Sequence, residues 1–384
     1  MTRRERLMAT LRGETVDRPA VSFYEIGGFP VNPGDPDKFN IYNSASWRPL
    51  LKLAGDHTDI IRMVSPVRAQ SHLSWADRAG PEARRQFIEE KVWEQGNSRF
   101  TRLAYRIGNR ELTTLTRRDR DVDTVWIIEP LLKSREEVKL FLELPDELFE
   151  EDINIQYLED QEKALGDSGI VMVDTEDPVC ASASLFSLEA FTLFAMTENK
   201  LLHPLLEKHS RYLYRRTEKV ARDFPGRLWR IYGPEYVTEP FLPPSLFDEY
   251  VVAYTGPMVR QIKASGGFVR IHSHGRIKNV LGHIVRMGAD AIDPVEPPPH
   301  GDVFLKDVRR EYGKELVLFG NVEITDIENM PSDSFRKVVR QTLKDGTSGE
   351  GRGFVLMPSA SPYGRNITEL ILGNYKIMIE ETGE

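Results

Sequence analysis

Two histidines separated by a single residue give the sequence its clearest chemical signal. His272 and His274 directly follow a short apolar run, and in an extended segment this spacing places both rings on one face, because side chains alternate along a strand. Two imidazoles and a carboxylate from a neighbouring strand end can bind a divalent metal and leave one coordination position open. We therefore predict that both histidines bind a metal, with Asp293, Glu296 and Glu323 as the candidate carboxylate ligands. The alternative is that one histidine packs in the mouth of a barrel while the other forms a hydrogen bond with a carboxylate.

Polar residues at the ends of other predicted strands supply candidates for catalysis and substrate binding. Tyr232, Glu235 and His274 are the candidate catalytic residues, since a positioned phenol, carboxyl or imidazole can protonate a leaving group. The residues predicted to contact the substrate are Tyr24, Glu25, Asp174, Glu296 and Asn321. Some of these positions also have structural interpretations: Asp293 and Asn321 suit turns that satisfy backbone groups, and the tyrosines suit packing at a rim.

These residues need a scaffold that brings strand ends together. Short apolar runs alternate with amphipathic segments along the chain, which is the pattern of parallel βα units. The eight strand-like runs lie near residue 20, near residue 60, and at 169–173, 227–231, 268–271, 289–292, 316–319 and 354–357. We predict one α/β domain over residues 1–384, a (β/α)8 TIM barrel in which the carboxyl ends of the strands share one face. A doubly wound open sheet is the alternative, but no glycine-rich phosphate-binding loop follows a strand.

Residues 91–132 interrupt the alternation of strands and helices. The segments 99–106, 111–116 and 122–128 alternate in character and are rich in β-branched and aromatic residues, and Gly108-Asn109 separates the first two. This pattern predicts an antiparallel β meander inserted into the barrel. We expect the meander to form a lid or wall over the site.

Composition excludes several classes of function. The net charge is −8 and arginine-rich pieces are interleaved with acids, so we expect no nucleic-acid partner. The single cysteine, Cys180, excludes an intrachain disulfide and a thiolate-dominated metal site. The N-terminal residues lack the apolar core of a secretory signal, and no apolar stretch is long enough to span a bilayer. We therefore expect a cytoplasmic protein with no membrane partner.

Several motifs, taken in order along nearly the whole chain, resemble the uroporphyrinogen decarboxylase superfamily. They are Arg4-Glu5-Arg6-Leu7, Gly13-Glu14, Asp17-Arg18-Pro19, Ile271-His272-Ser273-His274-Gly275, Gly288-Ala289-Asp290-Ala291-Ile292-Asp293, Gly320-Asn321-Val322-Glu323 and Asn374-Tyr375. The resemblance implies a (β/α)8 barrel, in agreement with the strand count, and homodimers are common among such proteins.

The superfamily contains two chemistries, and the resemblance favours one of them. The decarboxylase itself uses no metal and grips a tetrapyrrole bearing many carboxylates with an arginine-rich segment after the first strand. Here that segment is Tyr24-Glu25-Ile26-Gly27-Gly28-Phe29-Pro30, which contains no arginine. The corrinoid-dependent methyltransferases instead bind zinc through a His-x-Cys pair. His272 matches that histidine, His274 stands at the cysteine position, and no cysteine follows the last strand.

The resemblance therefore implies a metal-assisted methyltransferase or O-demethylase. Such an enzyme would move a methyl group between a small substrate, for example a methoxylated compound, and a corrinoid presented by a partner protein. The implied cofactors are zinc and that corrinoid. A histidine-rich ligand set would suit activation of an oxygen centre. Two alternatives remain open: a metal-free decarboxylase acting on a carboxylic acid or tetrapyrrole, and a non-catalytic barrel that binds a corrinoid or tetrapyrrole.

Overall fold

Eight parallel strands form a curled sheet at the centre of the protein. The computed structural model describes residues 1–23, 26, 28, 31–67 and 86–383. The strands are β1 (Ala20–Val21), β2 (Ile60–Val64), β7 (Gly169–Glu176), β8 (Leu228–Tyr232), β9 (Phe268–His272), β10 (Ala291–Asp293), β11 (Val317–Val322) and β12 (Phe354–Pro358). Their order in the sheet is β1-β12-β11-β10-β9-β8-β7-β2. The predicted (β/α)8 TIM barrel is confirmed.

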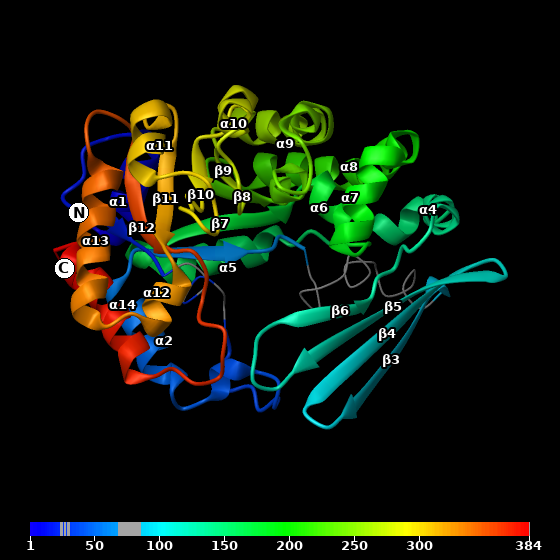
Figure 1. The fold of residues 1–384 in the computed structure, drawn as a ribbon, viewed down its shortest axis with the longest axis horizontal. Helices are drawn as coiled ribbons and strands as arrows, with labels where there is room; N and C mark the ends of the chain where they lie inside the picture. The colour runs from blue at the N-terminus through cyan, green and yellow to red at the C-terminus, as the bar shows by residue number, and fades with distance from the viewer. Residues whose placement is uncertain (24–25, 27, 29–30, 68–85, 384) are drawn as a thin grey trace.

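Helices cover the outer face of the curled sheet (Figure 1). The α-helices are α1 (Arg3–Arg12), α2 (Trp47–His57), α4 (Arg135–Leu142), α5 (Ile155–Leu165), α6 (Pro178–Ala183), α7 (Leu188–Thr197), α8 (Asn199–Asp223), α9 (Ala253–Ala264), α10 (Leu281–Met287), α11 (Leu305–Tyr312), α12 (Ile324–Asn329), α13 (Ser332–Thr347) and α14 (Glu369–Glu381). The short helical turns are η1 (Ile41–Asn43), η3 (Asp146–Phe149), η4 (Gly166–Ser168), η5 (Pro234–Val237), η6 (Pro244–Leu246) and the π-turn η7 (Asp248–Val252). Within the described part of the chain, no helix is both long and apolar enough to cross a membrane.

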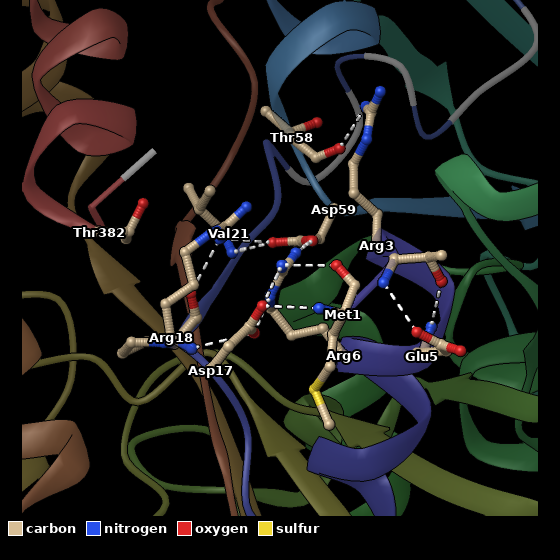
Figure 2. A network of polar contacts seen from close by, with 12 residues as sticks. Met1, Arg3, Glu5, Arg6, Asp17, Arg18, Val21, Thr58, Asp59 and Thr382 are labelled. Carbon is tan, nitrogen blue, oxygen red and sulfur yellow. Dashed lines mark hydrogen bonds and ion pairs between the residues drawn. The ribbon is translucent and has the colours of Figure 1, made fainter.

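A buried carboxylate joins the two ends of the sheet. The Asp59 backbone N–H, just before β2, donates to the Val21 carbonyl of β1 at 2.7 Å, and the Asp59 side chain accepts from the Val21 N–H at 2.9 Å. Arg6 of α1 and Arg18 also donate to Asp59, as Figure 2 shows. Asp17 completes the network by pairing with Arg6, which lowers the pKa of this aspartate well below its usual range. The N-terminal motifs therefore close the barrel at the end opposite the candidate site.

The alternation of side chains along each strand creates two apolar layers. Inside the barrel, Met63, Met172, Phe319 and Met357 belong to one buried cluster. Residues of opposite parity pack outward against the helices in a second, larger cluster, as Val173 does. Because side chains alternate with a period of two, the residue two positions beyond an inward apolar side chain also points inward. This rule places the polar residues at the carboxyl ends of the strands in the mouth of the barrel.

An antiparallel sheet is inserted between β2 and α4, as predicted. It consists of β3 (Ile88–Gln95), β4 (Ser98–Ile107), β5 (Arg110–Asp119) and β6 (Val125–Glu129), paired in chain order. Arg99 anchors this sheet to the loop after β1 through two contacts with Asp37, at 2.8 and 2.9 Å, and its guanidinium lies 4.2 Å from the ring centroid of Phe39. The sheet begins three residues before the predicted boundary and has four strands rather than three. Its role as a lid or wall stays a prediction.

Candidate active site

The carboxyl ends of β8, β9 and β10 bring three predicted site residues side by side. Tyr232 is paired in register with His272, and His272 with Asp293. His274 lies two residues beyond the end of β9, where the chain has left the sheet. The parallel register thus assembles the site from residues that are far apart in sequence, as expected at this face of a barrel.

His272 belongs to a buried chain of polar contacts. Its Nδ1 lies 2.8 Å from Asp293 Oδ2, and the other oxygen of Asp293 lies 2.8 Å from Nε of Arg270. Burial, reinforced by the charge of Arg230, lowers the pKa of His272 to about 3. Burial alone would raise the pKa of Asp293, but Arg270 and His272 together lower it to about 2. His272 is therefore neutral, with its Nδ1–H donated to the Asp293 carboxylate and its lone pair on Nε2.

His274 has the opposite electrostatic setting. Its Nδ1 donates to Glu296 Oε1 at 2.9 Å, while the Gly275 N–H donates to the other oxygen of Glu296 at 2.9 Å. The imidazole is 42% exposed and Glu296 is 8% exposed. Burial alone would lower the pKa of His274, but the hydrogen bond and charge of Glu296 raise it above its usual value. His274 therefore keeps its proton to higher pH than an isolated histidine.

The two rings are adjacent but differ in their protonation. Their centroids lie 4.7 Å apart with an interplanar angle of 88°. Burial lowers the pKa of His272, whereas the contact with Glu296 raises the pKa of His274. Titratable neighbours whose pKa values are pushed apart are a common basis for acid–base division of labour. The arrangement can supply a proton donor at the rim beside a lone-pair nitrogen deeper in the barrel.

Tyr232 and Glu235 lie close to this histidine pair. Glu235 is in η5, directly after β8, and its carboxylate accepts from the Gly233 N–H at 3.0 Å. Burial raises the pKa of Glu235, although the charges of His274 and Arg230 oppose that shift. The ring centroid of Tyr232 lies 5.0 Å from the guanidinium carbon of Arg230. All three predicted catalytic residues are therefore brought to one region of the mouth.

Two arginines in the barrel interior were missed in the sequence. Arg230 donates from Nη1 to Asp174 at 3.0 Å and contacts the sulfur of Met63 at 3.6 Å. Arg270 lies beside it in register on the next strand and pairs with Asp293. The signal that identifies them is the period of two, because Arg230 precedes Tyr232 by two residues and Arg270 precedes His272 by two.

Other predicted residues lie outside this group or have structural roles. Glu323 pairs with His300 at 3.1 Å and accepts from Ser359 at 3.3 Å. The Asn321 side chain donates to the Val295 carbonyl at 2.6 Å, which is the backbone-satisfying role considered for it. The predicted substrate contacts Tyr24 and Glu25 lie outside the described residues.

The predicted metal ligands do not converge on one point. No group of three or more histidine, cysteine, aspartate and glutamate side chains in the described ranges is arranged to hold a metal ion. Asp293 faces Arg270 and the Nδ1 side of His272, while Glu323 faces His300. The two Nδ1–carboxylate contacts do match the way proteins orient metal-binding histidines, but among the residues that the structure describes no third donor joins them. Zinc binding stays a prediction.

Comparisons with known proteins agree with this fold. The model of the uroporphyrinogen decarboxylase (URO-D) family matches residues 162–362, a segment that contains β7–β12 and the two histidines with their carboxylate partners. The fold is similar to that of a methyltransferase from Methanosarcina mazei, with a TM-score of 0.60 and 14% identity, covering 100% of this chain and 98% of that one.

More distant comparisons add little. A D-psicose 3-epimerase (TM-score 0.34, 12% identity, 64% of this chain and 83% of that chain) and a Bacteroides ovatus GH5 xyloglucanase (TM-score 0.33, 11% identity, 61% of each chain) are too dissimilar to carry an argument. No curated protein sequence matches. The family match spans more than half of the chain, so the chain belongs to the uroporphyrinogen decarboxylase (URO-D) family.

Proposed function

We propose that this protein is a methyltransferase-like enzyme that takes a methyl group from an oxygen atom of a small substrate. The acceptor is a corrinoid carried by a partner protein, which would supply the nucleophile when bound. The similarity in fold to the Methanosarcina mazei methyltransferase over the whole chain supports the general class. The His274–Glu296 pair, a half-exposed imidazole whose positive form is stabilised at the barrel mouth, is the observation that carries the proposal.

The role of His274 follows from the balance of the reaction. When the methyl–oxygen bond breaks, its electron pair stays on oxygen, and the departing alkoxide or phenoxide needs a proton. The His274 imidazolium donates that proton from Nε2, while Glu296 holds Nδ1 at 2.9 Å and thereby orients the ring. Glu235, whose pKa is raised by burial, is placed to act as the second proton-donating group. The His272 ring, which lies deeper in the barrel, is neutral and adds no charge beside His274.

Exposed apolar side chains support docking of a partner protein. Trp126, Ile127 and Ile128 of β6 are exposed, as are Leu193 and Met196 of α7. Figure 1 shows β6 and α7 on the right-hand side of the view, beyond the end of β7. A partner that covered such side chains would remove apolar surface from water, which favours association.

The test combines turnover with metal analysis. The full-length protein is incubated with chemically reduced cob(I)alamin and a panel of methoxylated compounds, and methylcobalamin and the demethylated product are quantified together. We expect the parent protein to form methylcobalamin and the demethylated product in equal amounts, and the control variant His300→Ala to form as much of each as the parent. His274→Ala should form much less of both products. Metal content is measured in the parent and in the His272→Ala and His274→Ala variants. Zinc that is lost in both variants would support the predicted ligands.

Metal-free decarboxylation is the second candidate, and the buried arginines favour it. Arg230 and Arg270 place cationic groups inside the barrel, and His274 could protonate the carbon that loses carbon dioxide. Release of carbon dioxide from a carboxylic acid, with no methyl transfer from any methoxylated compound, would replace the proposed function by this one. Tight corrinoid binding without turnover of either kind would instead indicate a non-catalytic binder.

A further inference from the structure

We propose that Asp177, which has no part in the proposed function, is a positioning residue that holds Glu235 in the mouth of the barrel. Asp177 directly follows β7 and caps the start of α6, and the residue is 0% exposed. The inference rests on the proposed function only for the role of Glu235 as a proton donor. The placement of Glu235 is a property of the fold and can be tested without turnover.

A helix cap accounts for only one of the contacts of Asp177. Its Oδ1 accepts from the Cys180 N–H at 2.7 Å, which is the ordinary task of the residue before the first turn of a helix. Serine, threonine or asparagine would perform that task without burying a carboxyl group, which is costly unless the group forms further hydrogen bonds. The second oxygen, Oδ2, accepts from the hydroxyl of Thr255 on α9 at 2.9 Å. The Asp177 side chain therefore joins α6 to α9.

The turn after β8 packs directly against this carboxyl group. The Asp177 backbone N–H donates at 2.9 Å to the carbonyl of Tyr232, the last residue of β8. The next residue, Gly233, has a φ of 124°, which favours glycine. A Cβ atom at Gly233 would lie 2.4 Å from Asp177 Oδ1 and 2.3 Å from the Cβ of Cys180, well inside ordinary van der Waals contact. The position of the Gly233 backbone is therefore set by Asp177 and the first turn of α6.

The same turn carries Glu235. The Gly233 N–H donates to Glu235 Oε2 at 3.0 Å, and the Gly233 carbonyl accepts from the Tyr236 N–H at 3.1 Å. Glu235 thus takes its position from the residue that lies against Asp177. Burial raises the pKa of Glu235 and the charge of His274 opposes that shift, so these two side chains are close enough to interact. A displacement of Gly233 would therefore move the Glu235 carboxyl group relative to His274.

The electrostatic setting of Asp177 agrees with this arrangement. Burial is the main reason that the pKa of Asp177 rises to about 7, and the charges of Glu235 and Glu176 add to the shift against the two hydrogen bonds that the carboxyl group accepts. An influence of Glu235 on this pKa requires that the two carboxyl groups lie near each other. Asparagine has the shape of a protonated aspartate, and its amide can donate to the Thr255 hydroxyl oxygen. We therefore expect asparagine at position 177 to keep the turn in place.

Cys180 allows a measurement that does not depend on turnover. It is the only cysteine in the chain, and its Cβ lies directly beside Gly233, so its thiol reports on the packing of this turn. The rate of its alkylation by iodoacetamide is measured by mass spectrometry on the full-length protein. Asp177→Ser keeps an acceptor for the Cys180 N–H but cannot also reach Thr255. We expect it to react about tenfold faster than the parent, because loss of a hydrogen bond to a buried carboxyl group favours local opening, and Asp177→Asn to react at the parent rate.

Two further variants separate this effect from a general loss of stability. Thr255→Val removes only the second hydrogen bond of Asp177 and should raise the rate in the same direction as Asp177→Ser. Asn154→Ser exchanges the cap of α5, where Asn154 accepts from the Tyr157 N–H at 3.1 Å, and is the matched control. Thermal melting checks that each variant is folded during the reaction. Parent-like reactivity of Cys180 in both Asp177→Ser and Thr255→Val, or an equal increase in Asn154→Ser, would overturn the inference.

Turnover then separates the inference from the proposed function. In demethylation assays Asp177→Ser should lower kcat and leave KM unchanged, while Asp177→Asn retains most of the parent rate. The double variant Asp177→Ser/Glu235→Gln should be no slower than Glu235→Gln alone, because Asp177 acts through Glu235. Additive losses, or full activity in Asp177→Ser, would overturn the inference and leave the proposed function in place. The expected response of Cys180 without any methyl transfer would support the positioning role of Asp177 and contradict the proposed function.

Discussion

Replacement of Asp293 by asparagine tests whether the buried chain below the two histidines is held together by charge. Asp293 and Arg270 are each 1% exposed and their ion-pair atoms lie 2.8 Å apart. Asp293→Asn keeps the shape of the side chain but leaves the buried guanidinium without this counter-charge. Loss of one partner of a buried pair typically costs about 3–5 kcal/mol, since the remaining charge stays desolvated.

This loss of unfolding free energy can be converted to a change in melting temperature. An unfolding entropy of about 2.1 cal/mol/K per residue gives roughly 0.8 kcal/mol/K for the 384 residues. A loss of about 3–5 kcal/mol then lowers Tm by roughly 4–6 °C. Differential scanning calorimetry and circular dichroism at pH 7 measure the change.

The double variant Arg270→Met/Asp293→Asn is the control for this experiment. It removes both charges, and buried pairs replaced by uncharged side chains often cost little. We expect it to melt at a higher temperature than Asp293→Asn alone. A single variant that melts with the parent, or a double variant less stable than the single one, would refute the charge-compensation reasoning.

Three further predictions concern the histidines. His274→Ala should lower the rate of methyl transfer by about 10²–10⁴-fold, the usual contribution of a general acid, while His300→Ala retains the parent rate; equal losses in both would contradict the assignment. Because Glu296 raises the pKa of His274, the rate should fall as pH rises through that pKa, and Glu296→Gln should move the fall to lower pH in a pH–rate profile. Burial lowers the pKa values of His272 and His209 to about 3. The stability that each neutral histidine contributes to the fold is therefore fully present above its pKa in the unfolded chain, and it is lost as pH falls from that value toward 3. In that window each histidine should lower the free energy of unfolding by about 1.4 kcal/mol for each pH unit of acidification. His209→Gln should remove the share of this pH dependence that comes from His209, as measured by unfolding at a series of pH values.

The barrel could be predicted from the sequence because its signal is local and repeated. Apolar runs at 169–173, 227–231, 268–271, 316–319 and 354–357 each overlap an observed strand within a few residues. The short strand β10 was predicted to begin two residues early, since 289–292 was predicted and Ala291–Asp293 is observed. Apolar runs identify strands well because a buried parallel sheet excludes polar residues from their interiors.

The same rule explains why the interior arginines were missed. A charged residue inside an apolar run, such as Arg230 or Arg270, contradicts the signal that identifies the strand. Its position becomes reasonable only when Asp174 and Asp293 on neighbouring strands provide opposite charges. Those partners are 56 and 23 residues away in sequence, and their pairing depends on sheet register, which a single sequence does not specify.

The contrast between the two histidines follows from where the chain leaves the sheet. His272 is the last residue of β9, so its ring is buried in the barrel and paired with the strand-borne Asp293. His274 is two residues further on, where the ring reaches solvent and meets Glu296 from the loop after β10. The two pKa values therefore shift in opposite directions, because burial outweighs the carboxylate at His272 whereas the carboxylate of Glu296 outweighs burial at His274. Any substrate that uses both rings must bind at this boundary, in contact with His274 at the rim and with the buried His272 below it.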